Sequence, residues 1–287
     1  MKRIYIILVS ALISMSLYSQ PGRDRDVRKD FSMDQYQRNI SRDIFGYLQY
    51  ENSMGERASL KKDVFDNWIY SDNRNNEVKY SKEYWNSILQ DFHQNDKRIF
   101  LWLIEMYADQ SNYKEEYKVD IFGYQQYENN KGQRASLKKD IFDAWVYSDS
   151  RNNEIKYSKE YREDMLRYSY YDDMDAFFRF KDMCENLSNY KEEYKIDIFG
   201  YQQYQNNQGE KASLKKDIFD RMVYEDNKGT KIDLDERDWS RLLRKYHSDK
   251  EVFMMFIQRY LFDNRFMEFH CLFSLLISDN IGTILKT

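Results

Sequence analysis

Side chains that could carry out catalysis are few in this chain of 287 residues. It contains three histidines and two cysteines, and no motif groups them. His270 and Cys271 are adjacent in the sequence, but adjacency alone does not make the nucleophile–base pair that covalent catalysis needs. The patterns G-x-S-x-G, H-E-x-x-H and C-x-x-C and the P-loop do not occur in the sequence. We therefore expect no catalytic residue, no metal site and no cofactor.

The other two histidines occupy corresponding positions of a sequence repeat. His93, Tyr170 and His247 follow one another at a spacing of 77 residues. A position near a helix end that accepts either histidine or tyrosine is typical of packing, because a catalytic group would not be exchanged between copies. We interpret these histidines as packing residues.

A set of polar side chains recurs at the same spacing and forms the candidate binding surface. These residues are expected on the strand face opposite the apolar side chains. One interpretation is a periodic surface for an extended or multivalent partner. The other is a solvated sheet face kept similar by recent duplication, since antiparallel sheets commonly leave one face wet. The candidates are Gln49, Ser59, Lys61, Gln126, Ser136, Lys138, Gln203, Ser213 and Lys215.

A long internal repeat sets this spacing. Residues 43–82 and 120–159 are identical at 31 of 40 positions, and a third copy starts at Asp197 and diverges after Tyr224. Repeats of this kind predict stacked units that bury their apolar faces against their neighbours. The predicted organisation is a signal peptide at 1–20, an N-terminal linker with a lead-in strand at 21–42, and repeat units at 43–119, 120–196 and 197–287, the last with a divergent C-terminal end.

A shorter period of 20 residues within each unit predicts β-hairpins. Asp72 and Asp149 are each followed three positions later by an asparagine, at Asn75 and Asn152, and glycine takes that place in other copies. This is the pattern of a type I turn followed by a bulge residue at positive φ. We therefore expect both asparagines to have left-handed backbone conformations.

The hairpin geometry also predicts which face of the strands is buried. It places Tyr50 opposite Ala58 and Leu48 opposite Leu60, and the same face is apolar in the later hairpins. Aromatic residues at strand spacing usually pack in a core. A buried aromatic ladder is therefore favoured over an aromatic platform for sugars.

Other segments show helical spacing of their apolar residues. Helices are expected within 81–92, 173–187, 235–246 and 252–262, the last one preceded by Ser248 as N-cap. The predicted fold is α+β, a repeat array of antiparallel β-hairpins that alternate with helix pairs. Phe142, in the motif DIFD at 140–143, is expected to be a buried corner that anchors one hairpin to the next.

The N-terminus and the charge pattern indicate the compartment. Lys2 and Arg3 precede an apolar run at 4–18, which predicts a signal peptide cleaved near residues 19–20 and a secreted or periplasmic bacterial protein. Charges of both signs are interspersed without a basic block, so nucleic acid is not expected as a partner. Cys184 and Cys271 either form a disulfide or remain two separate buried thiols.

These observations favour an exported, non-enzymatic repeat protein that acts as a binding module for a protein or a surface glycan. Its surfaces are copied, whereas enzymes concentrate their chemistry at one place. The alternative is a cell-envelope hydrolase whose site lies in the divergent third unit. After signal cleavage no membrane span is expected.

Overall fold

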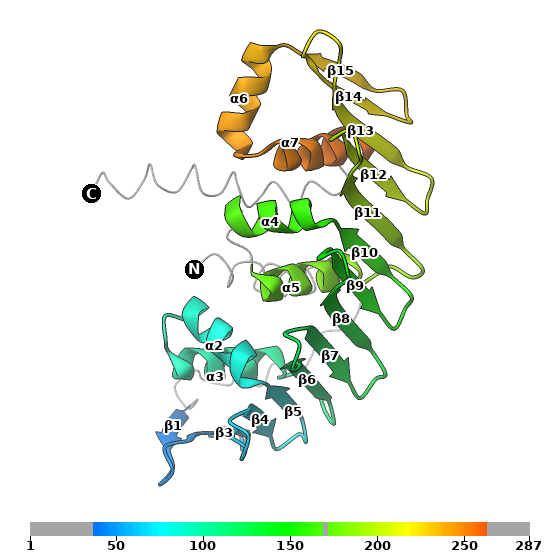
Figure 1. Ribbon diagram of the computed structural model, residues 1–287. Helices are drawn as coiled ribbons and strands as arrows, with labels where there is room; N and C mark the ends of the chain where they lie inside the picture. Colours follow the sequence, from blue (N-terminus) through cyan, green and yellow to red (C-terminus); the bar gives the residue numbers. More distant parts are fainter. Residues whose placement is uncertain (1–36, 169–171, 263–287) are drawn as a thin grey trace, which may run out of the picture. The chain divides into compact units, whose positions relative to one another are not determined.

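The computed structural model describes residues 37–168 and 172–262 (Figure 1). The signal-peptide prediction, Tyr170, His270 and Cys271 lie outside the described residues. No helix in the described ranges has the length and apolar character needed to cross a membrane. The chain divides into two units, residues 1–135 and 136–287, and the boundary lies within strand β8.

The fold is α+β, as predicted, with a mostly antiparallel open sheet of 15 strands whose order follows the chain. The described residues also form six α-helices and one π-helix. The first unit contains β1 Arg38–Arg42, β2 Leu48–Asn52, β3 Arg57–Lys62, β4 Trp68–Asp72, β5 Glu77–Tyr80, α2 Lys82–Asp91, α3 Asp96–Met106, β6 Lys114–Val119 and β7 Gln125–Asn129, and β8 is Arg134–Lys139. The second unit contains β9 Trp145–Asp149, β10 Glu154–Tyr157, α4 Lys159–Tyr168, α5 Asp173–Met183, β11 Lys191–Ile196, β12 Gln202–Asn206, β13 Lys211–Lys216, β14 Met222–Asp226, β15 Lys231–Leu234, α6 Glu236–Tyr246, α7 Asp249–Phe256 and the π-helix η2 Ile257–Leu261.

In the first unit, helices α2 and α3 lie on one face of the strands (Figure 1). Helix α2 begins after Ser81, whose hydroxyl accepts a hydrogen bond from the backbone N–H of Tyr84. The indole of Trp85, from α2, stacks on Trp68 of β4 with ring centroids 4.6 Å apart. Aromatic side chains from the strands and helices therefore form the core between the two layers.

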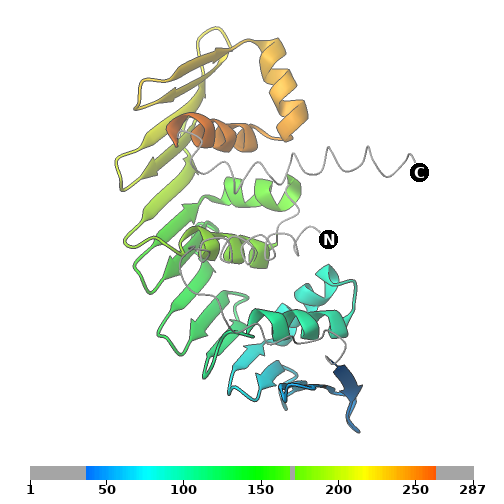
Figure 2. The same cartoon turned by 180° about the vertical axis from the view of Figure 1, so that it is seen from behind.

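The second unit builds a similar core, with its helices again on one side of its strands (Figure 2). Phe180 of α5 packs edge-on against Tyr157 of β10, with ring centroids 5.0 Å apart. Asp172 caps α5 through a full capping box with Asp175. Ser248 caps α7 by accepting from the backbone N–H of Glu251, as the sequence predicted.

The hairpin register confirms the predicted pairing. Tyr50 lies opposite Ala58 and Leu48 lies opposite Leu60, and all four side chains are buried. Asn75 and Asn152 both have a φ of 63°, as the turn pattern required. The recurrence of the same elements in both units is compatible with the predicted repeat.

The structure adds one feature that the sequence did not predict and contradicts one prediction. First, β5 pairs with β6, and β10 with β11, in a parallel manner across the helix pairs. Second, the prediction that Phe142 is a buried corner was wrong, because 72% of Phe142 is exposed. The motif DIFD forms the turn between β8 and β9, so its apolar side chains lie beyond the ends of the strands and are largely exposed.

Candidate functional site

The polar residues predicted as a binding surface lie on the sheet face opposite the buried aromatic residues. Their glutamines take part in a hydrogen bond that recurs along the chain. Each glutamine Nε2 donates to the Oδ2 atom of the aspartate that begins the preceding turn. The three pairs are Gln49 with Asp43 at 3.2 Å, Gln126 with Asp120 at 2.8 Å, and Gln203 with Asp197 at 3.2 Å. These glutamines therefore brace the turns as well as lining the polar face.

Serines and a lysine of the same set contact polar side chains of the neighbouring strand. Ser59 Oγ lies 3.0 Å from Ser71 Oγ, in a cross-strand hydroxyl pair. The Lys215 ammonium donates to Glu225 at 2.7 Å. Lys61 and Lys138 are exposed. The polar face thus presents amides, hydroxyls and charges in a repeating arrangement.

A shallow hollow of about 320 Å³ opens on this face over strands β1 to β4. It includes Gln49 and Ser59 from the predicted set and adds Ser41 and Ser71. An ion pair between Glu51 and Arg57, with 3.0 Å between Oε1 and Nε, forms part of its wall. Hydroxyl, amide and charged groups in one hollow suit a ligand rich in hydrogen-bonding groups.

In the second unit, neighbouring groups determine the ionisation of a turn aspartate, Asp140. Burial opposes ionisation of Asp140, but the Lys156 ammonium at 2.9 Å and two backbone N–H groups outweigh it. The pKa of Asp140 therefore lies below its ordinary value. The aspartate remains ionised and holds its turn in place.

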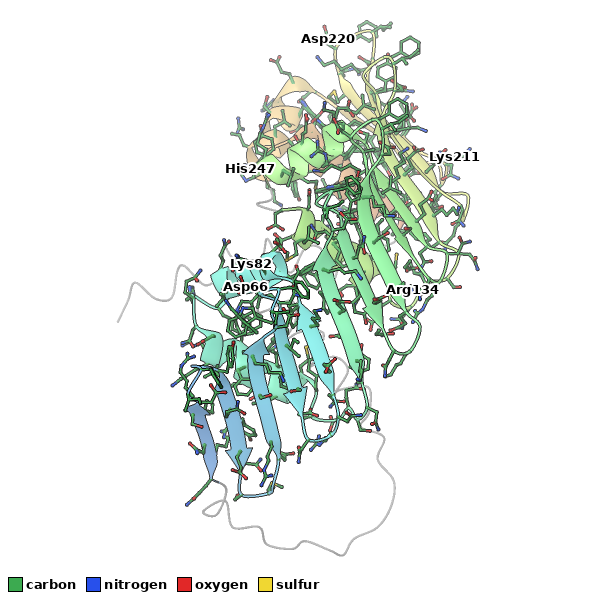
Figure 3. All side chains as sticks on the ribbon, turned by 60° about the horizontal axis from the view of Figure 1, so that its bottom comes forward. Asp66, Lys82, Arg134, Lys211, Asp220 and His247 are labelled. Carbon is green, nitrogen blue, oxygen red and sulfur yellow. The ribbon has the colours of Figure 1, made fainter. Side chains whose placement is uncertain are left out.

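A second surface, which sequence reasoning missed, consists of apolar turns at one edge of the strands. Six turns share the pattern Asp, aliphatic residue, Phe, and then Gly or Asp. We call these the apolar turns: 43–46, 63–66 and 120–123 in the first unit, and 140–143, 197–200 and 217–220 in the second. Their aliphatic side chains are 91 to 93% exposed and their phenylalanines 71 to 78% exposed. Figure 3 shows Asp220, the last residue of one apolar turn, at one end of the strands of its unit, and Lys211 farther along them.

The apolar turns are held by internal hydrogen bonds despite their exposure. In the turn at 43–46, the Oδ1 atom of Asp43 accepts from the backbone N–H of Phe45 at 2.9 Å and of Tyr47 at 3.0 Å. The N–H of Gly46 donates to the carbonyl of Asp43 at 2.9 Å. The other five turns repeat this pattern, with Gly or Asp at positive φ in the fourth place. The sequence does contain a signal for this surface. The pattern Asp, aliphatic residue, Phe, and then Gly or Asp marks a turn, and side chains in a turn cannot lie in the core of a sheet.

The opposite edge of the strands carries mostly polar turns bridged by asparagines, with Met54 as an exposed apolar side chain in one of them. Asn73 accepts from the N–H of Arg57 at 3.2 Å and donates to the carbonyl of Gly55 at 2.9 Å. Asn227 makes the same pair of bonds with Lys211 and Gly209. The two edges of the strands are therefore chemically different.

The histidines of the repeat slot lie at helix ends, as expected, but they do not pack. His93 and His247 are exposed and have φ values of 54° and 67°. The packing interpretation was therefore wrong for these two side chains. Figure 3 shows His247 at the end of α6.

Within the described ranges, no group of three or more histidine, cysteine or carboxylate side chains is placed to hold a metal ion. Cys184 is a buried thiol, and burial raises its pKa to about 12, so it remains protonated. Comparisons with protein-family models, curated proteins and solved structures found no match for this chain.

Proposed function

We propose that the chain is an exported, non-enzymatic repeat protein of three units, at 43–119, 120–196 and 197–287, which acts as a binding module for a protein or a surface glycan. The observation that supports it most is the polar strand face. The same glutamine, serine and lysine positions recur there in each copy, and the hollow over β1 to β4 includes two of them. A surface that is copied suits a partner that is itself extended or repeated.

The chemistry of the hollow favours a glycan as the first partner to test. The hollow offers hydroxyl, amide, carboxylate and guanidinium groups, which match the hydroxyl groups of a polysaccharide. It is shallow and open, which suits a chain that lies along the strands. The aromatic residues of the sheet are buried, so polar contacts, not stacking, would hold the sugar.

The test measures binding of the mature protein to immobilised peptidoglycan and to outer-membrane polysaccharide. Replacing Gln49 and Ser59 together by alanine is expected to weaken binding about tenfold, because each lost hydrogen bond contributes roughly 0.5–1.5 kcal/mol. Glu83→Ala, on an exposed position of α2 far from the polar face, serves as the matched control. Equal binding by both variants would contradict the assignment of the polar face. A peptide ligand that competes at the same residues would assign the face to a protein partner.

Export is tested separately by N-terminal sequencing of the protein isolated from the cell envelope or medium. The mature chain is expected to begin between about residues 17 and 22, within the range of signal-peptide cleavage sites. Retention of Met1 on that protein would contradict export by a cleaved signal peptide.

A further inference from the structure

We propose that the apolar turns of each unit dock on the surface of a lipid bilayer, with their aliphatic and phenylalanine side chains inserted among the lipid headgroups. This function is additional to binding at the polar face and uses different residues. It rests on the exposure, the internal bonding and the charge environment of the six turns.

The fold itself does not account for the apolar side chains of these turns. The turn geometry requires the first aspartate, which accepts two backbone N–H groups, and a residue at positive φ in the fourth place. The second and third side chains are largely exposed and meet neither requirement. The residue that follows is a tyrosine in the three turns that end in glycine, and its ring lies 5.9 to 6.3 Å from the phenylalanine ring of the turn. In the other three turns it is Asn67, Ala144 or Arg221, so a tyrosine contact does not account for the apolar pair there. An apolar pair kept in all six turns therefore indicates an interaction outside the fold.

The uniformity of the turns points to a partner that is uniform along the edge. The strands of a sheet lie about 4.8 Å apart. In the first unit the turns at 43–46 and 63–66 are separated by two strand spacings, roughly 10 Å, and the turn at 120–123 follows after three, roughly 14 Å. The apolar turns are therefore separate exposed groups along the edge. A fluid bilayer can accommodate such groups at any spacing, whereas a folded protein partner would need a matching pocket for each.

Backbone N–H groups of an apolar turn are hydrogen-bonded within the turn, so the turn can enter a medium of low polarity. Buried backbone donors without partners are costly in lipid. In the turn at 140–143, the N–H groups of Phe142 and Ala144 donate to Asp140 Oδ1, and the N–H of Asp143 donates to the Asp140 carbonyl. Three successive donors are thus satisfied within the turn, so shallow insertion leaves them bonded.

In the three turns that end in aspartate, at 63–66, 140–143 and 217–220, the charges are balanced, which indicates the kind of bilayer. Each exposed aspartate in the fourth place has a lysine close by. The pairs are Asp66 with Lys62 at 3.7 Å and Lys82 at 3.8 Å, Asp143 with Lys159 at 3.5 Å, and Asp220 with Lys216 at 3.8 Å. Figure 3 shows Asp66 and Lys82 close together at this edge. Paired charges of opposite sign match zwitterionic headgroups, and long lysine stems keep their ammonium groups at the headgroup level.

The experiment is co-sedimentation of the mature protein with phosphatidylcholine vesicles at 0.1 M and 0.5 M NaCl, as order-of-magnitude conditions of weak and strong screening. Binding is expected at both salt concentrations, because insertion of apolar side chains does not depend on screening. Replacing one apolar pair by two serines should lower the partition coefficient at least about tenfold, since even partial burial of two such side chains contributes more than about 1.4 kcal/mol. The full variant of the first unit replaces six residues by serine: Ile44, Phe45, Val64, Phe65, Ile121 and Phe122.

The matched control is Met54→Ser, because Met54 is 66% exposed but lies in a turn at the opposite edge of the strands. It should bind vesicles like the unchanged protein. Thermal unfolding should be similar for all variants, since the replaced side chains are exposed. Absence of vesicle binding, or equal binding by the six-residue variant and Met54→Ser, would overturn the proposal. Loss of a protein partner by the six-residue variant without any vesicle binding would assign the turns to protein recognition instead.

The two functions are distinguished by the polar-face variant. For this test the polar-face variant is Ser59→Ala with Ser71→Ala, because these two hydroxyls line the hollow and bond to each other, whereas Gln49 also braces the turn at 43–46. It should bind vesicles normally while losing the glycan. If that variant lost both activities, the surfaces would not be independent and lipid docking through the turns would be wrong.

Discussion

At the scale of single residues, one position of the repeat determines the hydrogen bonding of a buried glutamate. In the first unit the Tyr107 hydroxyl donates to Oε1 of Glu115. The corresponding position of the second unit is Cys184, and Oε1 of Glu192 has no hydrogen-bond partner among the described residues. Burial raises the pKa of Glu192 to about 7, although two tyrosine hydroxyls donate to its other oxygen. The two units therefore hold the same acid in different environments.

The pKa of Glu192 predicts how the free energy of unfolding depends on pH. Its folded value of about 7 exceeds the ordinary value of 4.5, so between these values the unfolded chain releases a proton that the folded chain retains. Stability is therefore lost as pH rises through this window, by up to about 3 kcal/mol, and is level above it. Glu192→Gln should remove this loss. The measurement is urea unfolding at several pH values for both proteins, and parallel pH profiles would contradict the assignment.

Glu115→Gln is the matched control for this experiment. Both carboxylate oxygens of Glu115 accept hydrogen bonds, from Tyr107 and from Tyr113. The substitution replaces one acceptor by an amide N–H, so it should lower stability at pH 8, whereas Glu192→Gln should raise it. Opposite signs at two corresponding positions would show that the missing tyrosine hydroxyl causes the difference.

Asn152 tests the backbone of a hairpin turn. Its φ of 63° strains a β-branched side chain, so Asn152→Val should cost about 1–2 kcal/mol. Asn152→Gly fits the backbone but loses an exposed hydrogen bond from Asn152 Nδ2 to Asn189 at 3.0 Å, so its stability should stay within about 0.5 kcal/mol of the unchanged protein. Denaturant melts of both variants check this. Equal stabilities of the valine and glycine variants would contradict a positive φ at residue 152.

At the scale of elements, the apolar turns and the core should respond oppositely to truncation of phenylalanine. Phe142→Ala removes a side chain that is 72% exposed and should change stability by less than about 0.5 kcal/mol. Phe180→Ala leaves a cavity beside Trp145 and Tyr157 and should cost about 3–5 kcal/mol. Thermal or urea melts measure both. A large loss of stability for Phe142→Ala would show that Phe142 is buried after all, as the sequence analysis expected.

The hairpins could be predicted from the sequence, whereas the two surfaces could be predicted only in part. Turn chemistry acts locally, so Asn75 and the register of Leu48 against Leu60 were correct. The parallel pairing of β5 with β6 depends on where a helix pair returns the chain, and no local pattern encodes that. The polar face followed from strand alternation. Phe142 was misplaced because an apolar side chain was assumed to be buried, although its turn position excludes it from the core.

At the scale of the whole molecule, the repeat predicts that an entire copy can be removed. Deleting residues 120–196 joins Val119 to Asp197 and recreates the sequence that already surrounds Asp120. Strand β6 would then pair with β12 in a register it already uses with β7, since Tyr117 lies opposite Tyr127 and Tyr194 lies opposite Tyr204. The shortened chain should fold with native-like circular dichroism and a cooperative melt.

A deletion out of phase with the repeat is the control for this prediction. Removing residues 120–186 joins β6 to the bend at 187–190 that precedes β11, so the strand loses the apolar turn that pairs it with the next strand. This protein should unfold without cooperativity or aggregate. If both deletions behaved alike, the units would not be interchangeable and the boundaries proposed above would be wrong.

The order of the strands in the sheet follows the chain, and this has a consequence for how the protein forms. Neighbouring strands are joined by tight turns, and even the parallel neighbours are linked by residues 37 positions apart, as at Asn75 and Asn112. Contacts that are close in sequence form quickly. A chain that emerges end first, from a ribosome or through a narrow channel, can complete each hairpin before the next one appears. We therefore expect this protein to fold progressively from its N-terminal side, with each finished edge serving as a template for the strand that follows.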